Sequence, residues 1–157
     1  EEGQANEIIY SISNTNNGNY FICSTANSLA EPGVYQPKIA KMDMEGNIDW
    51  QRSFAANGKS YHRFSAAGTE KGDIVLVGSS GRQVATGYDE DAFMVRIDEK
   101  GNIIWSYPYG TYDNDDWGWS VFETPDNNIV FVGSTKSFGA SLFDIYLVGT
   151  NAEGISQ

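Results

Sequence analysis

The sequence feature that most restricts the fold is an internal repeat with a period of about 54 residues. The segment GDIVLVGSS at 72–80 returns as NNIVFVGST at 127–135, and GNYFICSTA at 18–26 is a more divergent copy. Gly78 and Gly133 are 55 positions apart in this alignment. A repeat of this kind marks one supersecondary unit that is stacked on its neighbours. We therefore expect residues 1–157 to form a single repeat domain.

The flanking segments keep the same period, so three copies can be delimited. They cover about 1–55, 56–110 and 111–157, and no separate domain or linker is left over. No window shows a sustained helical period of 3.6 residues. Runs of β-branched and aromatic residues alternate instead with turns rich in Gly, Asn and Asp. The sequence predicts an all-β fold in which each copy is a four-stranded antiparallel sheet.

The second copy shows the expected strands most clearly. Ile74–Val77 is a short run of β-formers that ends at Gly78. Phe93–Ile97 alternates large apolar side chains with Met and Arg, as in a half-buried strand. Ile103–Tyr107 is aromatic and β-branched, and it is closed by Pro108 and Gly110. In the third copy, Val121 and its flanking residues predict a fourth, weaker strand before the turn TPDNN.

Repeats of this length with four strands each are typical of β-propeller blades. A single sheet has two faces, and stacking sheets around an axis covers both of them. The phrases EGNIDW and KGNIIW place Trp50 and Trp105 at the same point of two copies. We expect these tryptophans, with Gly78 and Gly133, to be blade-packing residues. The alternative for the tryptophans is a role in stacking on a ligand.

The third copy reaches only EGISQ at 153–157, short of the tryptophan position of the other copies. The last sheet is therefore expected to lack its final strand. Three explanations stand: a fragment of a longer propeller, a dimer that closes a six-bladed ring, or strands exchanged between subunits in a filament. For strand exchange, the expected donor is the β-forming run that contains Ile8, Ile9 and Tyr10.

The second and third copies resemble the β-propeller repeats of secreted bacterial and archaeal proteins. The resemblance is carried by GNIIWSYPYGTYDNDDWGWSVFETPDNNIVFVGST and by GSTKSFGASLFDIYLVGTNAEG. Those repeats read approximately as Gly-Asn-x-x-Trp, Tyr-Gly, an acidic stretch before Ser, Thr-x-Asp-Gly, Gly-x-Thr, Ser-Phe-Gly and Asp-x-Tyr. The first copy departs from the pattern at Ser24, Gln36 and Pro37. The resemblance implies an extracellular or cell-surface propeller-type repeat, and it implies no catalytic residue.

Charge and composition restrict the partners. The net charge is −11 and the pI is about 4.3, which disfavours nucleic acid and anionic lipid. No run approaches 18 apolar residues, so we expect no membrane insertion. Cys23 is the single cysteine, which excludes an intrachain disulfide, and its strand context predicts an inert buried thiol.

The acidic stretch YDNDDWGW at 112–119 is the candidate cation site. Asp113, Asp115 and Asp116 could supply hard oxygen ligands to Ca²⁺, although the glycine and the distal glutamate of a calcium loop are misplaced. The alternative is a solvated turn. No other cofactor is expected. Trp117 and Trp119 in the same stretch could stack on a sugar ring, so carbohydrate is a further candidate partner.

No constellation of catalytic residues is visible. His62 is the only histidine, and the repeat alignment places it in a turn between strands. We therefore expect a structural or adhesive building block, not an enzyme, that assembles with other copies of itself through strand or blade completion. The alternative is a ligand-binding propeller that recognises carbohydrate or peptide at a loop face, and a remnant of a propeller enzyme is a third reading.

Overall fold

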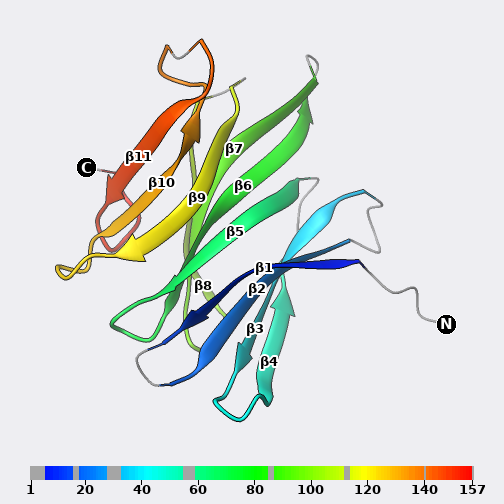
Figure 1. The fold of residues 1–157 in the computed structure, drawn as a ribbon, viewed down its shortest axis with the longest axis vertical. Helices are drawn as coiled ribbons and strands as arrows, with labels where there is room; N and C mark the ends of the chain where they lie inside the picture. The colour runs from blue at the N-terminus through cyan, green and yellow to red at the C-terminus, as the bar shows by residue number, and fades with distance from the viewer. Residues whose placement is uncertain are drawn as a thin grey trace.

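The computed structural model describes residues 6–15, 18–27, 33–54, 59–84, 87–111, 114–139 and 141–156 (Figure 1). Eleven strands form three antiparallel sheets, and none of the residues in these ranges is helical. The expected all-β class and the division into four, four and three strands are confirmed. Each sheet lies within one of the three sequence copies.

The three sheets have the following strands. Sheet 1 contains β1 (Glu7–Asn14), β2 (Tyr20–Asn27), β3 (Tyr35–Met42) and β4 (Ile48–Ser53). Sheet 2 contains β5 (Ser60–Gly68), β6 (Ile74–Val84), β7 (Gly87–Ile97) and β8 (Ile103–Tyr109). Sheet 3 contains β9 (Asp116–Glu123), β10 (Ile129–Thr135) and β11 (Asp144–Thr150). In every sheet, strands that are consecutive in sequence are hydrogen-bonded neighbours.

Six of the hairpin turns share one geometry, which explains much of the repeated sequence. In the turn after β7, the amide of Gly101 donates to the carbonyl of Asp98, and the amide of Asp98 donates to the carbonyl of Asn102. Gly101 has a φ of 82°, in the left-handed region that glycine adopts without steric cost. This is the three-residue hairpin loop with a glycine bulge. Asn127, with a φ of 63°, takes the glycine position in the turn between β9 and β10.

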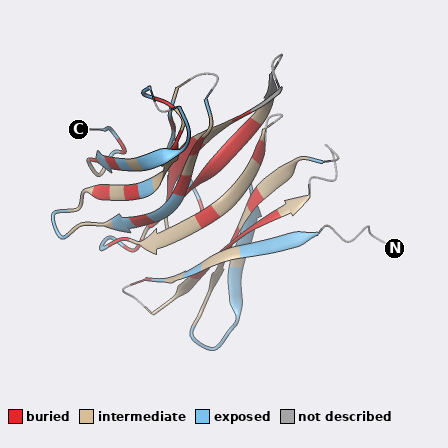
Figure 2. Ribbon diagram, turned by 45° about the horizontal axis from the view of Figure 1, so that its top comes forward, coloured by how far each residue is buried: buried red, intermediate tan, exposed pale blue. Residues whose placement is uncertain are grey.

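The core is divided into two layers, one on each face of sheet 2. Phe21, Cys23 and Ile39 of sheet 1 pack against one face, which includes Leu76 and Val95. The opposite face packs against sheet 3. The residues of that second layer are Val75, Val77, Ala92, Met94, Tyr109, Val121, Ile129, Phe131 and Val148. The most buried part of the molecule is therefore the middle sheet, whereas the flanking sheets show exposed segments (Figure 2).

The first strands of the three sheets lie next to one another. β5 contacts both β1 and β9. The fourth strands, β4 and β8, are the last members of their sheets and lie away from this inner row. The stack is therefore blade-like, with an inner and an outer edge for each sheet.

Two expectations about strand ends are wrong. Gly78 does not end a strand but lies inside β6, which continues to Val84. A β-carbon at this position would lie 2.8 Å from the carbonyl oxygen of His62 and 2.9 Å from the ring of Phe64, at the register shift of β5. The glycine therefore permits a close approach of neighbouring strands and does not form a turn. His62 itself is in β5, not in a turn, and burial lowers the pKa of its imidazole.

Candidate assembly interface

Trp50 and Trp105 occupy equivalent positions at the two junctions between sheets. The indole N–H of Trp50, on β4, donates to the carbonyl oxygen of Glu99 at 2.9 Å. The indole N–H of Trp105, on β8, donates to the carbonyl oxygen of Ala152 at 3.1 Å. Glu99 and Ala152 are the second residues of equivalent turns, in sheets 2 and 3 respectively. Each tryptophan is partly buried, and it joins the outer strand of one sheet to a turn of the next.

The glycine of each receiving turn lies directly against the tryptophan ring. A β-carbon on Gly154 would be 2.9 to 3.0 Å from three ring atoms of Trp105. A β-carbon on Gly101 would be 3.1 Å from Cη2 of Trp50 and 2.6 Å from Nε of Arg52. The turn glycines therefore serve two purposes, since they adopt a positive φ and leave room for the aromatic ring.

Two further side chains strengthen the second junction, and sequence reasoning did not identify them. Arg96 is buried, forms an ion pair with Asp73 at 2.9 Å, and donates from Nη1 to the carbonyl of Ala152 at 3.1 Å. The hydroxyl of Tyr109 donates to the carbonyl of Gly154 at 2.6 Å. The sequence signal was weak because Lys41 takes the place of Arg96 in the first copy.

The turn between β3 and β4 of sheet 1 has the same geometry as these two turns, but no described sheet packs against its glycine. Gly46 has a φ of 90°, and its amide donates to the carbonyl of Asp43. No atom of the described residues lies within 4 Å of a β-carbon placed there. Side-chain and backbone hydrogen bonds from Asn47 hold the pKa of Asp43 below its ordinary value. The turn is thus fully formed where no tryptophan contacts it.

The outer face of sheet 3 presents apolar side chains to solvent. Val132 pairs with Leu147 in this sheet, as Val77 pairs with Met94 in sheet 2. Val77 and Met94 are completely buried beneath sheet 3, whereas Leu147 is 66% exposed. We call the exposed surface the sheet 3 end face, and its residues are Phe122, Val132, Ile145 and Leu147. It is the counterpart of the face of sheet 2 that sheet 3 covers.

The outer face of sheet 1 is equivalent to the other face of sheet 2, the one against which sheet 1 packs. Ile22 pairs with Ile12 and with Ala40, just as Leu76 of sheet 2 pairs with Ala66 and Val95. Leu76 is buried beneath sheet 1, whereas Ile12 is 60% exposed. We call this surface the sheet 1 end face, and its residues are Ile9, Ile12, Ile22 and Ala40. The two end faces therefore correspond to the two sides of the junction that occurs twice inside the chain.

The other predicted packing and assembly residues have clear positions. Gly133 lies inside β10, where a β-carbon would be 1.8 Å from the carbonyl oxygen of Trp117. Ile8, Ile9 and Tyr10 lie in β1, which is paired with β2 of its own sheet. The ring of Tyr10 packs edge-on against Phe64 at 6.1 Å. Strand exchange through these residues would require β1 to leave that pairing, and it stays a hypothesis.

The predicted calcium ligands Asp115 and Asp116 have different partners in the structure. Asp116 is completely buried, and its carboxylate accepts hydrogen bonds from the hydroxyls of Thr135 and Ser137 and, at 3.2 Å, from the amide of Thr111. Asp115 forms an ion pair with Lys136 at 2.7 Å. Asp113 lies outside the described residues. Over the described residues, no group of three or more His, Cys, Asp or Glu side chains is arranged to hold a metal.

An aromatic cluster lies at one end of sheet 3. Trp117 packs against Phe143 at 4.2 Å and meets Trp119 edge-on at 5.8 Å. The guanidinium of Arg63 lies 4.7 Å from the Trp117 ring and is paired with Glu90. Trp119 is 45% exposed, and its indole N–H donates to the hydroxyl of Ser134. The cluster combines exposed ring surface with nearby polar groups.

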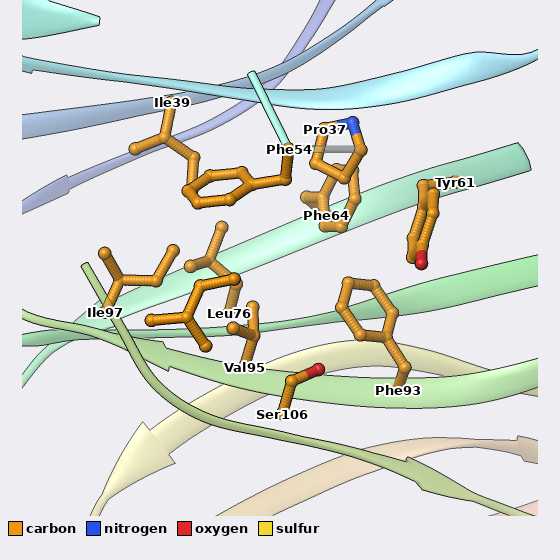
Figure 3. Close-up of a pocket in the computed structure, with 11 residues that line it drawn as sticks. Pro37, Ile39, Phe54, Tyr61, Phe64, Leu76, Phe93, Val95, Ile97 and Ser106 are labelled. Atoms are coloured by element: carbon orange, nitrogen blue, oxygen red, sulfur yellow. The ribbon is translucent and has the colours of Figure 1, made fainter. Parts of the chain in front are cut away.

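A cavity of about 210 Å³ lies between sheets 1 and 2 (Figure 3). Its walls are mostly apolar: Ile39 of β3, and Phe54, which follows β4, point toward Leu76, Val95 and Phe93 of sheet 2 in the close-up. These side chains belong to or adjoin the first core layer. Among the described residues that line the cavity, only Tyr61 has an ionisable side chain, so these residues offer mainly packing surface.

No protein-family model matches this sequence, and a comparison with curated proteins finds no match. The described part of the chain also contains no helix with the length and apolar character needed to cross a membrane. The evidence for a function is therefore the geometry of the junctions and end faces.

Proposed function

We propose that this chain is a structural or adhesive building block of the β-propeller type, extracellular or at the cell surface, that assembles with other copies of itself. Assembly occurs by stacking the sheet 3 end face of one copy on the sheet 1 end face of the next. The observation that carries the proposal is the relationship between the end faces. They are the two halves of a junction that already occurs between sheets 1 and 2 and again between sheets 2 and 3.

The end faces are also unusual for surfaces left in water. Ile145 is 82% exposed and Leu147 66%, and Ile9 at the other end is 68% exposed. Contiguous exposed apolar surface of this kind commonly marks a protein interaction site. Because the two faces differ, the contact is head to tail, which produces a closed ring or an open filament according to the rotation between copies.

The net charge opposes this association and provides a diagnostic. Copies that each carry −11 repel one another, and added salt screens that repulsion. Assembly through apolar faces is therefore expected to increase between low and moderate ionic strength. An assembly held by ion pairs between copies would instead weaken under the same change.

Sedimentation velocity with two single-face variants tests the proposal. Leu147→Glu disables the sheet 3 end face, and Ile12→Glu disables the sheet 1 end face. We expect the unaltered chain to assemble in a concentration-dependent manner and each variant alone to sediment as a monomer. An equimolar mixture should form a 1:1 dimer and nothing larger, since only one working face of each kind remains.

A matched control is Ile104→Glu, which places the same charge at a half-exposed isoleucine of the middle sheet, outside both end faces. This variant should assemble like the unaltered chain. Monomeric behaviour of the unaltered chain at all concentrations and salt levels would refute the proposal. Dimers of a single-face variant would refute the head-to-tail arrangement.

A second candidate function is ligand binding, with carbohydrate as the ligand. The supporting observation is the exposed aromatic cluster of Trp117, Trp119 and Phe143, because sugar rings stack on such surfaces. Nuclear magnetic resonance titration of the monomeric Ile12→Glu variant with oligosaccharides tests it. Saturable shifts confined to the indole signals of this cluster would favour binding, and unchanged spectra would reject it.

A further inference from the structure

The cavity between sheets 1 and 2 can be compared with the equivalent place at the second junction. In the repeat alignment, Leu76 in GDIVLVGSS corresponds to Phe131 in NNIVFVGST. Leu76 lines the cavity, and Phe131 is completely buried in the second core layer. Each residue faces the preceding sheet, since Leu76 belongs to the layer against sheet 1 and Phe131 to the layer between sheets 2 and 3. The first junction therefore has a leucine where the second has an aromatic ring.

The ring of Phe131 lies between two other rings. It meets Tyr109 edge-on, with 5.2 Å between the ring centroids, and it meets Tyr146 edge-on at 5.5 Å. Edge-to-face ring pairs at such separations stabilise a core beyond the area that they bury. Tyr109 belongs to β8 and Tyr146 to β11, so the Phe131 ring is held by side chains from both sheets of the second junction.

Both partners of that ring have aromatic equivalents at the first junction. Phe54 stands 55 positions before Tyr109, and Phe93 in DAFMVRID corresponds to Tyr146 in DIYLVGTN. Phe54 and Phe93 line the cavity, with Phe54 in the upper part of the view in Figure 3 and Phe93 in the lower part. The cavity therefore has the same aromatic walls as the second junction, with Leu76 in place of the central ring.

The size and lining of the cavity define what it can hold. Its volume is about 210 Å³, and an apolar protein cavity of about 150 Å³ is large enough to take up benzene. Among the described lining residues, none has a side chain that is charged at neutral pH, so a charged ligand would lose its hydration without compensation. Tyr61 and Ser106 each contribute a hydroxyl group to the lining. The lining therefore suits an uncharged aromatic ring with one hydrogen-bonding substituent.

The cavity reaches the surface beside β8. Ile103 and Ser106 line it and are exposed residues of that strand, and Ile103 is 49% exposed. Leu76 and Ile97 also line it and are buried. The cavity therefore has an entrance at the outer edge of sheet 2 and an apolar inner end.

We infer that this cavity is a binding site for an uncharged molecule of the phenol class, with a single aromatic ring and one hydroxyl group. The ligand ring lies between Phe54 and Phe93, as the Phe131 ring lies between Tyr109 and Tyr146. The ligand hydroxyl forms its hydrogen bond with a hydroxyl group of the lining. The site lies within one chain, so its occupancy does not depend on stacking between copies.

The probe is phenol, and its binding is measured by isothermal titration calorimetry on the unaltered chain. We expect saturable 1:1 binding. Methyl nuclear magnetic resonance spectra of the Ile12→Glu variant locate the site, and phenol should shift the methyl signals of Ile39 and Leu76. Benzoate has the same ring with a charged substituent, and cyclohexanol has the hydroxyl group without an aromatic ring. Each of these two compounds should bind at least tenfold more weakly than phenol.

A filling substitution makes the test specific. Leu76→Phe introduces the ring that the second junction has at this position, and it should weaken phenol binding at least tenfold. Leu142→Phe is the same change at an exposed residue that does not line the cavity, and it should leave binding unchanged. If Leu76→Phe does not fold, as judged by circular dichroism, Val95→Leu replaces it, because this change adds a methylene group to the cavity wall and should also weaken binding.

Four results would each overturn the inference. They are absence of saturable binding up to the solubility limit of phenol, equal affinity for benzoate or cyclohexanol, indifference to the filling substitution, and shifts confined to Trp117 and Trp119 in place of the cavity methyl groups. Assembly without phenol binding would refute only this site. Phenol binding by a chain that stays monomeric would refute only the proposed function.

Discussion

Three glycines in equivalent turns permit a direct measurement of what the sheet junctions contribute. Gly46, Gly101 and Gly154 have φ values of 90°, 82° and 78°, so an alanine at any of them experiences similar backbone strain. That strain costs about 1 kcal/mol of unfolding free energy for a non-glycine residue. The surroundings differ, because only Gly101 and Gly154 are in contact with a neighbouring sheet.

The expected destabilisation follows from the space around each glycine. The methyl group of Gly46→Ala meets no atom of the described part of the chain within 4 Å, so this substitution should cost only the backbone strain, about 1 kcal/mol. Gly154→Ala brings a methyl group to 2.9 to 3.0 Å from the Trp105 ring, so overpacking adds roughly 1–3 kcal/mol. Gly101→Ala should fall between these values, since its nearest neighbour is the flexible side chain of Arg52.

Urea unfolding followed by far-ultraviolet circular dichroism measures these free energies on the Ile12→Glu background, where assembly does not contribute. A double-mutant cycle supplies the control: in a Trp105→Ala chain, the cost of Gly154→Ala should fall to that of Gly46→Ala. Equal destabilisation by Gly46→Ala and Gly154→Ala would refute the reasoning. It would show that contact with a tryptophan does not change the unfolding free energy lost when the turn glycine is replaced.

Four further outcomes are expected. Burial raises the pKa of the Cys23 thiol to about 12, so the native chain should not react with a disulfide reagent at pH 8, and rapid labelling would contradict its burial. Asp116→Asn should cost roughly 2–3 kcal/mol, because it disrupts a buried hydrogen-bonded carboxylate, whereas Asp115→Asn should cost under about 1 kcal/mol; equal effects would contradict these roles. Hydrogen bonds from Asn102 lower the pKa of Asp98, so its stabilisation is fully present above the unfolded-state value near 4 and is lost as the pH falls through the lower folded-state pKa. Asp98→Ala should therefore destabilise more at pH 7 than at pH 2, as measured by urea unfolding. If Ca²⁺ binds the acidic stretch, a chelator should lower the melting temperature, and an unchanged melting curve would reject the calcium site.

The sequence was informative where the repeat itself carried the information. Trp50 and Trp105 are in register in the chain, and they occupy equivalent places in the structure, because each repeat unit faces the same neighbour. The acceptors of their hydrogen bonds could not be predicted. Both are backbone carbonyls, of Glu99 and Ala152, and a backbone group leaves no residue signature in a sequence.

Other features could not be predicted because one residue type has several structural uses. Gly78 was expected to end a strand, since glycine commonly marks turns, but it allows a close contact inside β6. Asp116 was grouped with its acidic neighbours as a candidate metal ligand. Its actual environment depends on Thr135 and Ser137, about twenty residues later in the chain, and only the pairing of β9 with β10 brings them together.

The order of the strands also has a consequence for the folding pathway. Every described strand pairs with its sequence neighbour, so each sheet can form from successive hairpins without closing a long loop. β5–β8 is covered on both faces by the other described sheets, whereas sheets 1 and 3 each have one covered face. Opening therefore begins at the outer sheets, and the amides of β6 and β7 should be the last to exchange with solvent. A copy seated on an end face would delay that opening, so the kinetic lifetime of each unit would depend on its position along the assembly.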